Sequence, residues 1–225
     1  MPIISILMPI YNGFEFLNQS LTSIINQTFT DWELIIGING HPQNSQFHLQ
    51  VVNFIALFND NRIKVIHYLN FGNKPKTLNL MINDCSTDII AILDVDDFWH
   101  KKKLEIQLPF LNNYDVVGTS CQYFGDNTNI PNLPYGNLND FDFFSYNPII
   151  NSSVILKKNI AIWNEETIIE DYDLWLNLFY LQKKSFFNIN QILCFHRIHN
   201  NSSFNNINHL YVDELKNKWK TIINS

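Results

Sequence analysis

Three carboxylates, Asp94, Asp96 and Asp97, follow directly on an apolar run near the middle of the chain. The run, residues 90–93, has the branched apolar side chains of a strand that is covered on both faces of a sheet. Acids at the carboxyl end of such a strand lie where open α/β sheets bind ligands. Because crowded anions repel one another, we expect Mn²⁺ or Mg²⁺, which prefers oxygen ligands, to bind there. The alternative is a structural cluster in the first turn of a helix.

The composition is that of an ordinary globular domain. The chain has 225 residues, of which 46% are hydrophobic and 16% charged, enough for a substantial core. Its formal net charge is −6, and the basic residues do not gather into one long run. We therefore expect no nucleic acid as the main partner.

Cysteine usage and hydropathy bear on the compartment. Cys85, Cys121 and Cys194 lie far apart and form no Cys-x-x-Cys pair, which argues against a disulfide framework and for a reducing environment. No run approaches the ~20 apolar residues that span a bilayer, so we expect no transmembrane segment. The amino terminus also lacks the basic region and cleavage site of a signal peptide. We expect a soluble cytoplasmic protein, or one peripheral on the cytoplasmic face of the membrane.

Strands and helices alternate along the first half of the chain. Apolar runs predict strands over residues 3–8, 32–38, 63–66 and 90–93, and helical spacing predicts helices over 14–25, 47–58 and 77–83. This alternation predicts an α/β fold with a mostly parallel sheet and helices on both faces. The second half is expected to contain helices at 101–111, 173–180 and 207–223, strands at 116–123, 152–156 and 192–197, and a loop at 125–148.

Six short motifs follow one another in a specific order. They are residues 5–12, 23–29 with 31–36, 93–99, 103–105, 170–176 and 197–199. Together they closely resemble the family 2 glycosyltransferases, over about residues 3–203. The resemblance implies one GT-A domain over residues 1–225, a Rossmann-like three-layer α/β/α fold. In such a domain, residues 1–100 would bind the nucleotide sugar, and residues 101–225 the acceptor, with a closing helix.

The activity that the resemblance implies is an inverting, metal-dependent sugar transfer. The donor is a nucleotide diphosphate sugar, with UDP favoured, and the acceptor is a hydroxyl on a glycan, lipid or protein. Asp94 matches the acid that contacts the ribose, and Asp96 matches the acid that holds the metal on the diphosphate. A cation there would stabilise the charge that develops as the nucleoside diphosphate departs. Asp97 is expected to support the metal or, alternatively, to cap the following helix.

The second acidic pair is Glu170 and Asp171. Asp171 matches the general base of the family, a carboxylate that takes the proton of the attacking acceptor hydroxyl. Glu170 would tune this base or orient the acceptor. The alternative is that both acids occupy the first turn of a helix, where the helix dipole favours negative charge.

Basic residues complete the expected donor site. His199 falls where relatives carry a late histidine that reaches the metal or diphosphate, and neutral imidazole suits Mn²⁺ better than Mg²⁺. The alternative is an ordinary surface histidine. Arg197 could pair with phosphate oxygens through its planar guanidinium group. Lys74 and Lys76 lie where relatives have a basic residue near the diphosphate, and Lys76 is assigned to the nucleotide.

The nucleobase is expected to lie against Tyr11, in a loop shaped by Pro9. Relatives end the second strand with two acids, the second of which reads the uracil imide, whereas this chain has Ile38 and Asn39. The side-chain oxygen of Asn39 can accept from uracil N3–H, but its amide group can also donate to an acceptor nitrogen. The base therefore stays open, with UDP as the leading prediction.

Acceptor contacts are expected from Trp99, Trp175 and Ser153. The two tryptophans match family positions and could stack on a sugar, although core packing is an equal alternative for both. Ser153 lies on the edge of a predicted strand, where relatives approach the acceptor. Residues 125–148 are expected to form a variable lid.

Two other functions compete with sugar transfer. A nucleotidyltransferase would need a Gly-rich, basic loop after the first strand, which residues 11–15 do not provide. A non-catalytic binding module is favoured by the acid lost at Ile38. It is disfavoured by the presence of the other residues expected in a catalytic site, which are Asp94, Asp96, Glu170, Asp171 and His199.

Overall fold

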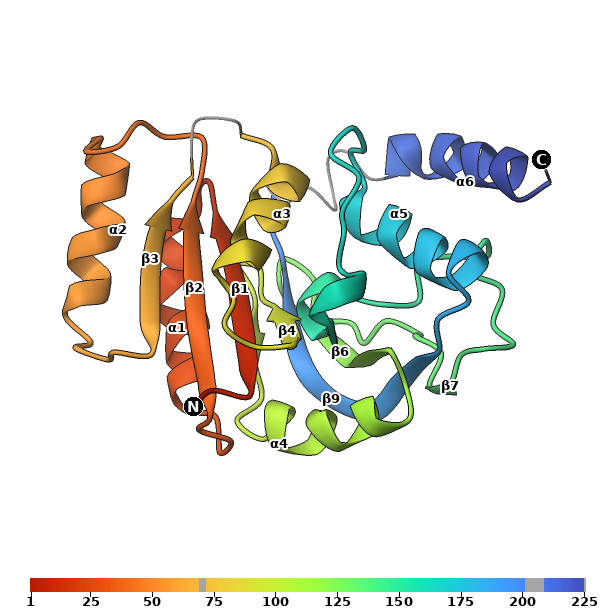
Figure 1. Ribbon diagram of the computed structural model, residues 1–225, viewed down its shortest axis with the longest axis horizontal. Helices are drawn as coiled ribbons and strands as arrows, with labels where there is room; N and C mark the ends of the chain where they lie inside the picture. Colours follow the sequence, from red (N-terminus) through yellow and green to blue (C-terminus); the bar gives the residue numbers. More distant parts are fainter. Residues whose placement is uncertain (69–71, 201–208, 225) are drawn as a thin grey trace.

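A computed structural model describes residues 1–68, 72–200 and 209–224, with only the backbone of His209 and Leu210. Parts of two predictions, residues 201–203 and 207–208, lie outside these described residues. The described chain forms a nine-stranded sheet in the order β3-β2-β1-β4-β8-β6-β9-β5, with β7 paired to β9. Helices cover the sheet on both faces (Figure 1).

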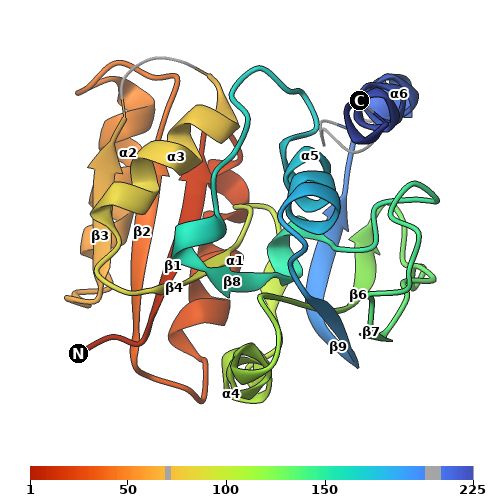
Figure 2. The same ribbon diagram turned by 45° about the vertical axis from the view of Figure 1, so that its right-hand side comes forward.

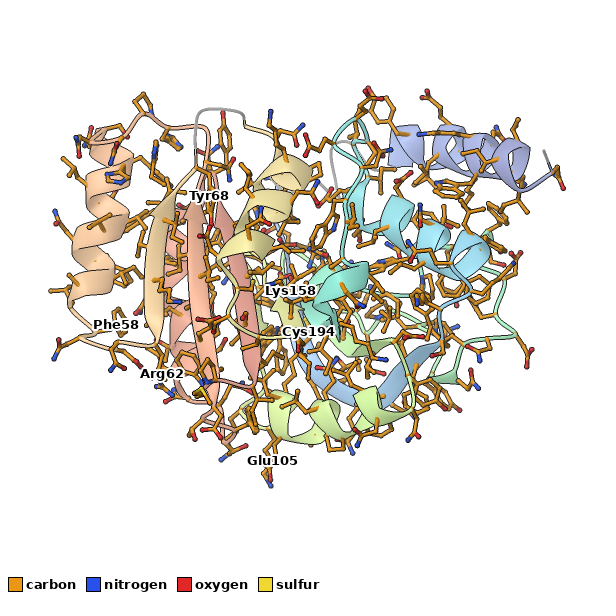
Figure 3. The ribbon with its side chains drawn as sticks, viewed as in Figure 1. Phe58, Arg62, Tyr68, Glu105, Lys158 and Cys194 are labelled. Atoms are coloured by element: carbon orange, nitrogen blue, oxygen red, sulfur yellow. The ribbon has the colours of Figure 1, made fainter. Side chains whose placement is uncertain are left out.

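The first half has the predicted alternation. The strands are β1 (Ile4–Ile10), β2 (Trp32–Ile38), β3 (Ile63–His67) and β4 (Ile89–Ile92), and the helices are α1 (Phe14–Ile25), α2 (Gln46–Ala56) and α3 (Lys74–Asp84). All pairs among these strands are parallel. Figure 3 shows β3 running from the side of Arg62 to that of Tyr68, so the carboxyl ends of the parallel strands meet at one edge.

The second half is mixed rather than parallel. Its elements are β5 (Phe98–Trp99), α4 (Lys103–Gln107), β6 (Val116–Gly125), β7 (Gly136–Asn137), β8 (Ile155–Lys157), α5 (Glu170–Leu176), β9 (Phe186–Ile198) and α6 (His209–Ile223). β8 is antiparallel to both β4 and β6, whereas β6 and β9 are parallel. Within the predicted helix 101–111, the α-helix ends at Gln107 and is followed by a 3-10 helix, Leu108–Asn112, because Pro109 has no N–H for the α-helical hydrogen bond.

Two boundaries in this half also differ from the prediction. Residues 152–153 belong to a 3-10 turn, Asn151–Ser153, and the strand begins after it. β9 begins at Phe186, well before the predicted 192, because its first half pairs with β6 and β7. Tertiary pairing, which no local pattern contains, decides both boundaries.

Alternate residues of the strands build two separate cores. Ile6 and Met8 pack on the side of α1 and α2, whereas Leu7 packs on the side of α3 and α5. Figures 1 and 2 show α3 and α5 on one face, α1 on the other, and α6 outside α5. This confirms the predicted three-layer α/β/α fold. Among the described residues, none of the helices has both the length and the apolar sequence that a bilayer crossing requires.

Opposite the carboxyl-end edge, one buried carboxylate joins three strands. Glu33 of β2 accepts hydrogen bonds from Ser5 Oγ of β1 at 2.6 Å and from Lys64 Nζ of β3 at 2.8 Å. It also accepts from Ser86 N at 2.7 Å, just before β4. Burial by itself would raise the pKa of Glu33, but the bonds from Lys64, Ser5 and Ser86 lower it to about 2. The ionised carboxylate therefore stabilises the parallel half of the sheet.

Glu33→Gln is expected to lower the free energy of unfolding at pH 7 by about 2–3 kcal/mol. A lowered pKa contributes stability above the ordinary value of 4.5, and that stability is lost as the pH falls towards 2. More than half of the difference should therefore disappear at pH 3. Urea unfolding at both pH values measures this effect, with the exposed Glu214→Gln as control. Equal differences at the two pH values would contradict this role for Glu33.

Candidate active site

A cleft of about 1040 Å³ opens at the carboxyl ends of the parallel strands. It is lined by the loops after β1, β2 and β4, by the starts of α3 and α5, by the end of β9 and by α6. It therefore brings together segments from both halves of the chain. Of the predicted residues, the cleft contains Pro9, Tyr11, Asn39, Asp94, Asp96, Glu170, Asp171 and His199.

Asp94 is held on both sides of its carboxylate. Lys74 Nζ lies 2.7 Å from its Oδ1, and Asn151 Nδ2 donates to its Oδ2 at 3.1 Å. The backbone N–H of Asp94 donates to Ser152 Oγ at 3.0 Å. Burial by itself would raise the pKa of Asp94, but Lys74 outweighs it and lowers the pKa. Asp94 is therefore a fixed, ionised group on the wall of the cleft.

Asp96 and His199 form a pair of potential metal ligands. His199 Nε2 lies 3.1 Å from Asp96 Oδ2, and both side chains are partly exposed in the cleft. Burial and the nearby charges of Asp97 and Asp94 raise the pKa of Asp96 to about 6. Negative charge at Asp96 is thus incompletely balanced by the protein.

This donor set fits a divalent cation that takes most of its ligands from substrate and water. Among residues 1–68, 72–200 and 209–224, no group of three or more His, Cys, Asp or Glu side chains is arranged to hold a metal. Mg²⁺ and Mn²⁺ sites often use one or two protein ligands, completed by substrate phosphates. An oxygen of Asp96 with a nitrogen of His199 matches this type of site, and the imidazole favours Mn²⁺ over Mg²⁺.

Asp97, expected to support the metal or to cap the next helix, is buried against β9 and does not line the cleft. Its side chain is 1% exposed and lies outside the cleft. One carboxylate oxygen pairs with His196 Nδ1 at 3.0 Å, and the other accepts from the backbone N–H of Arg197 at 2.8 Å. The cause is β5, which follows Asp97 at once and pairs with β9, so that the carboxylate faces that strand. Asp97 therefore holds the segment that carries the histidines.

Arg197 and Lys76 also lie outside the cleft, which corrects their assignment to the nucleotide. The Arg197 guanidinium packs on the rings of Phe16 and Phe124, at 4.4 and 4.3 Å from their centres. It also donates to the backbone carbonyl of Asp96. Lys76 is two positions from Lys74 on α3, which turns it to another side of the helix. Lys74 is the lysine of this helix that lines the cleft.

The second acidic pair, Glu170 and Asp171, lines the same cleft from the first turn of α5. Asp171 Oδ2 accepts a hydrogen bond from Asn147 Nδ2 at 3.0 Å, and Glu170 Oε1 lies 2.9 Å from Lys74 Nζ. Burial and the charge of Glu170 raise the pKa of Asp171 to about 7. A carboxylate with a pKa near neutrality is suited to take up a proton under physiological conditions.

Tyr11 presents its ring at the far end of the cleft, where 49% of the residue is exposed. A Cβ at Gly40, whose φ is +72°, would lie 2.1 Å from Tyr11 Cε2, so the ring needs glycine at that position. Pro9 and Asn39 line the same end. Asn39 Nδ2 is directed at the backbone carbonyl of Ile10, 3.3 Å away.

The three residues predicted to contact the acceptor are buried, and this prediction is wrong. Trp175 is 0% exposed in the core beside Phe186, and Trp99 is 3% exposed. Trp99 Nε1 donates to the backbone of Ser152, and Ser153 Oγ donates to the carbonyl of Ile150. None of the three lines the cleft. Their role is to pack and hydrogen-bond beneath it.

Sequence analysis missed three groups that hold the acids. They are His196 against Asp97, Asn147 against Asp171 and Asn151 against Asp94. Burial by itself would lower the pKa of His196, but Asp97 raises it to about 9. The position of His196, three residues before His199, was the available signal. Asparagine is so frequent in this sequence that Asn147 and Asn151 could not be distinguished from the other asparagines by sequence.

The fold is similar to that of solved glycosyltransferases. S. aureus TarS 1-349 in complex with UDP-GlcNAc matches with a TM-score of 0.76 and 14% identity, covering 96% of this chain and 66% of TarS. The mannosyltransferase PcManGT from Pyrobaculum calidifontis, in complex with GDP-Man and Mn²⁺, matches with a TM-score of 0.68 and 13% identity, covering 89% and 58%. At these identities the likeness shows the fold, which confirms the predicted GT-A class. The chain spans only 58–66% of the length of these two solved chains.

Sequence comparison agrees with the structural likeness. The O-antigen biosynthesis glycosyltransferase WbnJ of Escherichia coli is 30% identical over 210 residues, covering 89% of this chain and 81% of WbnJ. The profile of glycosyl transferase family 2 matches residues 5–186. The match favours sugar transfer over nucleotidyl transfer. The chain therefore belongs to glycosyl transferase family 2 and is a glycosyltransferase.

Proposed function

We propose that the protein transfers a sugar from a UDP-sugar to a hydroxyl group of a growing glycan, with inversion at the anomeric carbon and with a divalent cation. The observation that carries this proposal is the content of one cleft. The cleft is lined by Asp96 and His199, which lie 3.1 Å apart, and by Asp171, a carboxylate with a pKa near 7. Residues 1–100 would bind the donor and residues 101–225 the acceptor.

Asp96 and His199 would hold Mn²⁺ or Mg²⁺. When bound, the cation would act as a Lewis acid that stabilises the negative charge of the departing diphosphate. The proposal of Mn²⁺ is supported by the imidazole ligand and by the Mn²⁺ complex of PcManGT. Lys74 and Asn151 would keep Asp94 ionised and oriented towards the ribose.

Asp171 would act as the general base. Asn147 holds its Oδ2, and the carboxylate lines the cleft in which the acceptor hydroxyl would bind. As the acceptor oxygen attacks the anomeric carbon, its proton moves to Asp171, while the bond to the diphosphate breaks on the opposite face. A single displacement of this kind inverts the anomeric configuration.

Asn39 supports UDP over CDP. The carbonyl of Ile10 can only accept, so the side-chain nitrogen of Asn39 must face it, and Oδ1 remains for a ligand. This oxygen can accept from uracil N3–H, whereas cytosine offers a lone pair at the same position. The UDP-GlcNAc complex of TarS also supports UDP. Guanine, as in the GDP-Man complex of PcManGT, has an N–H as well and is the second candidate.

For the acceptor and the location in the cell, we propose a general class only. The name of WbnJ, a glycosyltransferase of O-antigen biosynthesis, supports a role in polysaccharide synthesis, with a glycan or glycolipid as acceptor. Cys85, Cys121 and Cys194 are buried free thiols, which supports the cytoplasm or the cytoplasmic face of the membrane.

The first test is a thermal-shift panel of UDP, GDP and CDP with and without Mn²⁺. Ligands that bind the folded state raise its apparent melting temperature. UDP is expected to give the largest shift, and only with Mn²⁺. Asp96→Asn should abolish the dependence on Mn²⁺, whereas the exposed Asp126→Asn should preserve it. A larger shift with CDP, or an unchanged response of Asp96→Asn, would contradict the assignment.

The second test concerns the base. Asp171→Asn should lower the rate of UDP release from a UDP-sugar by about 10²–10⁴-fold, because the amide cannot take the proton. Its affinity for UDP should stay the same. The rate is measured with Mn²⁺ and with water as acceptor, using Asp213→Asn, an exposed position on α6, as control. A rate like that of the wild type would remove Asp171 from the mechanism.

The third test distinguishes a residue that binds the nucleotide, Tyr11, from a residue that packs in the core, Trp175. Tyr11→Ala should weaken UDP binding by about tenfold or more, the ~1–3 kcal/mol of a stacked base. Since its ring is half exposed, the free energy of unfolding should change by less than about 0.5 kcal/mol. The fully buried Trp175→Phe should do the reverse, costing about 2 kcal/mol of stability with unchanged UDP affinity. Calorimetric titration measures the UDP affinity, and urea unfolding measures the stability. Weaker UDP binding in Trp175→Phe, with unchanged binding in Tyr11→Ala, would contradict these assignments.

A further inference from the structure

Helix α3 connects the two sides of the cleft. Its amino-terminal cap, Asn73, donates through Nδ2 to the carbonyl of Glu165 at 3.0 Å. Two turns later, Asn79 donates to the carbonyl of Trp163 at 2.8 Å and accepts from its N–H at 2.9 Å. Residues 163–165 lie five to seven positions before the first residue of α5, Glu170. The start of α5, with its acidic pair, is thus fastened to α3.

Lys74, the first residue of α3, bridges the two acidic groups. Its ammonium lies 2.7 Å from Asp94 Oδ1 and 2.9 Å from Glu170 Oε1. All three side chains are largely enclosed, with exposed fractions of 34%, 22% and 14% in that order. Because ion pairs that are partly shielded from water are strong, this bridge fixes Glu170 in one orientation.

Glu170 and Asp171 are adjacent carboxylates with different partners. Glu170 is paired with a cation, whereas Asp171 accepts from the neutral amide of Asn147. The Lys74 ammonium therefore occupies Glu170 Oε1, whereas no cation lies against the carboxylate of Asp171 in the ion pairs of the described residues. Burial and Glu170 raise the pKa of Asp171, and Lys74 lowers it. The other charged groups that line the cleft are Glu15, Asp94, Asp96, His196, His199 and Lys216.

We propose that Lys74 is a positioning residue that occupies Glu170 and so makes Asp171 the carboxylate that takes the acceptor proton. This inference rests on the proposed sugar transfer. Lys74 also connects the base to the donor side, because the same ammonium holds Asp94. Without Lys74, no cation would compensate the negative charge of Glu170, which lines the cleft together with Asp94 and Asp171.

The test is a titration of the Asp171 carboxyl carbon by ¹³C NMR, assigned with Asp171→Asn. In Lys74→Met, the charge of Glu170 is no longer compensated, so the pKa of Asp171 should rise by about one unit. Lys74→Arg should stay near the wild type. Lys76→Met, on the same helix but outside the cleft, is the matched control and should not shift. An unchanged pKa in folded Lys74→Met would overturn the proposal.

A second variant keeps the test valid if Lys74→Met does not fold. Glu170→Gln removes the neighbouring charge and should shift the pKa of Asp171 downwards, opposite to the loss of Lys74. No shift in this variant would also overturn the proposal, because Glu170 would then not act on Asp171.

Kinetics provide the readout that a merely structural role would not give. The acid limb of the pH profile of kcat/KM should move to higher pH in Lys74→Met, and the rate should recover at alkaline pH. A loss that is equal at all pH values would overturn the proposal. The NMR titration needs no substrate, so an inactive wild type would refute the sugar transfer alone, and an unmoved Asp171 would refute the role of Lys74 alone.

Discussion

Repulsion among the carboxylates at the end of β4 is the constraint on which the site depends. Asp94 is balanced by Lys74, and Asp97 is buried against His196. Asp96 instead faces the cleft, where burial and the two neighbouring acids raise its pKa to about 6. The protein thus compensates two acids internally and leaves the third for a ligand. A cation at that position would complete the balance of charge and, in the same place, favour a departing diphosphate.

Short elements from distant parts of the chain assemble this arrangement. The two-residue strand β5 pairs with β9 in the register Phe98 to Phe195, which brings residues about a hundred positions apart into contact. Asp97 meets His196 next to this pair, and Asp96 meets His199, which follows the last residue of β9. On the other side, α3 fastens the segment before α5. The parallel half of the sheet therefore carries Tyr11, Asp94 and Asp96, which we propose bind the donor, and pairings between segments far apart in the sequence bring the other cleft residues to them.

The order of the secondary-structure elements and the positions of the acids along the chain could be predicted from the sequence. The alternation of strands and helices, the acids at the end of β4 and the acids at the start of α5 all follow from periodicity and motif order. The directions of side chains did not follow, because non-local pairing sets them. Trp99 turns into the core since β5 pairs with β9, and Arg197 packs on Phe16 and Phe124. Lys76 lies two positions after Lys74 on α3, so the two side chains point to different sides of the helix and only Lys74 lines the cleft.

The site proposed here depends on Asp96 and His199 binding a cation together with the diphosphate of a nucleotide. A crystal structure with UDP and Mn²⁺, with diffraction measured at the manganese absorption edge, tests it most directly. We expect an anomalous peak in coordination contact with Asp96 and His199, with the diphosphate beside it and the uracil against Tyr11. A metal peak elsewhere, or a nucleotide bound away from the carboxyl end of β4, would contradict it.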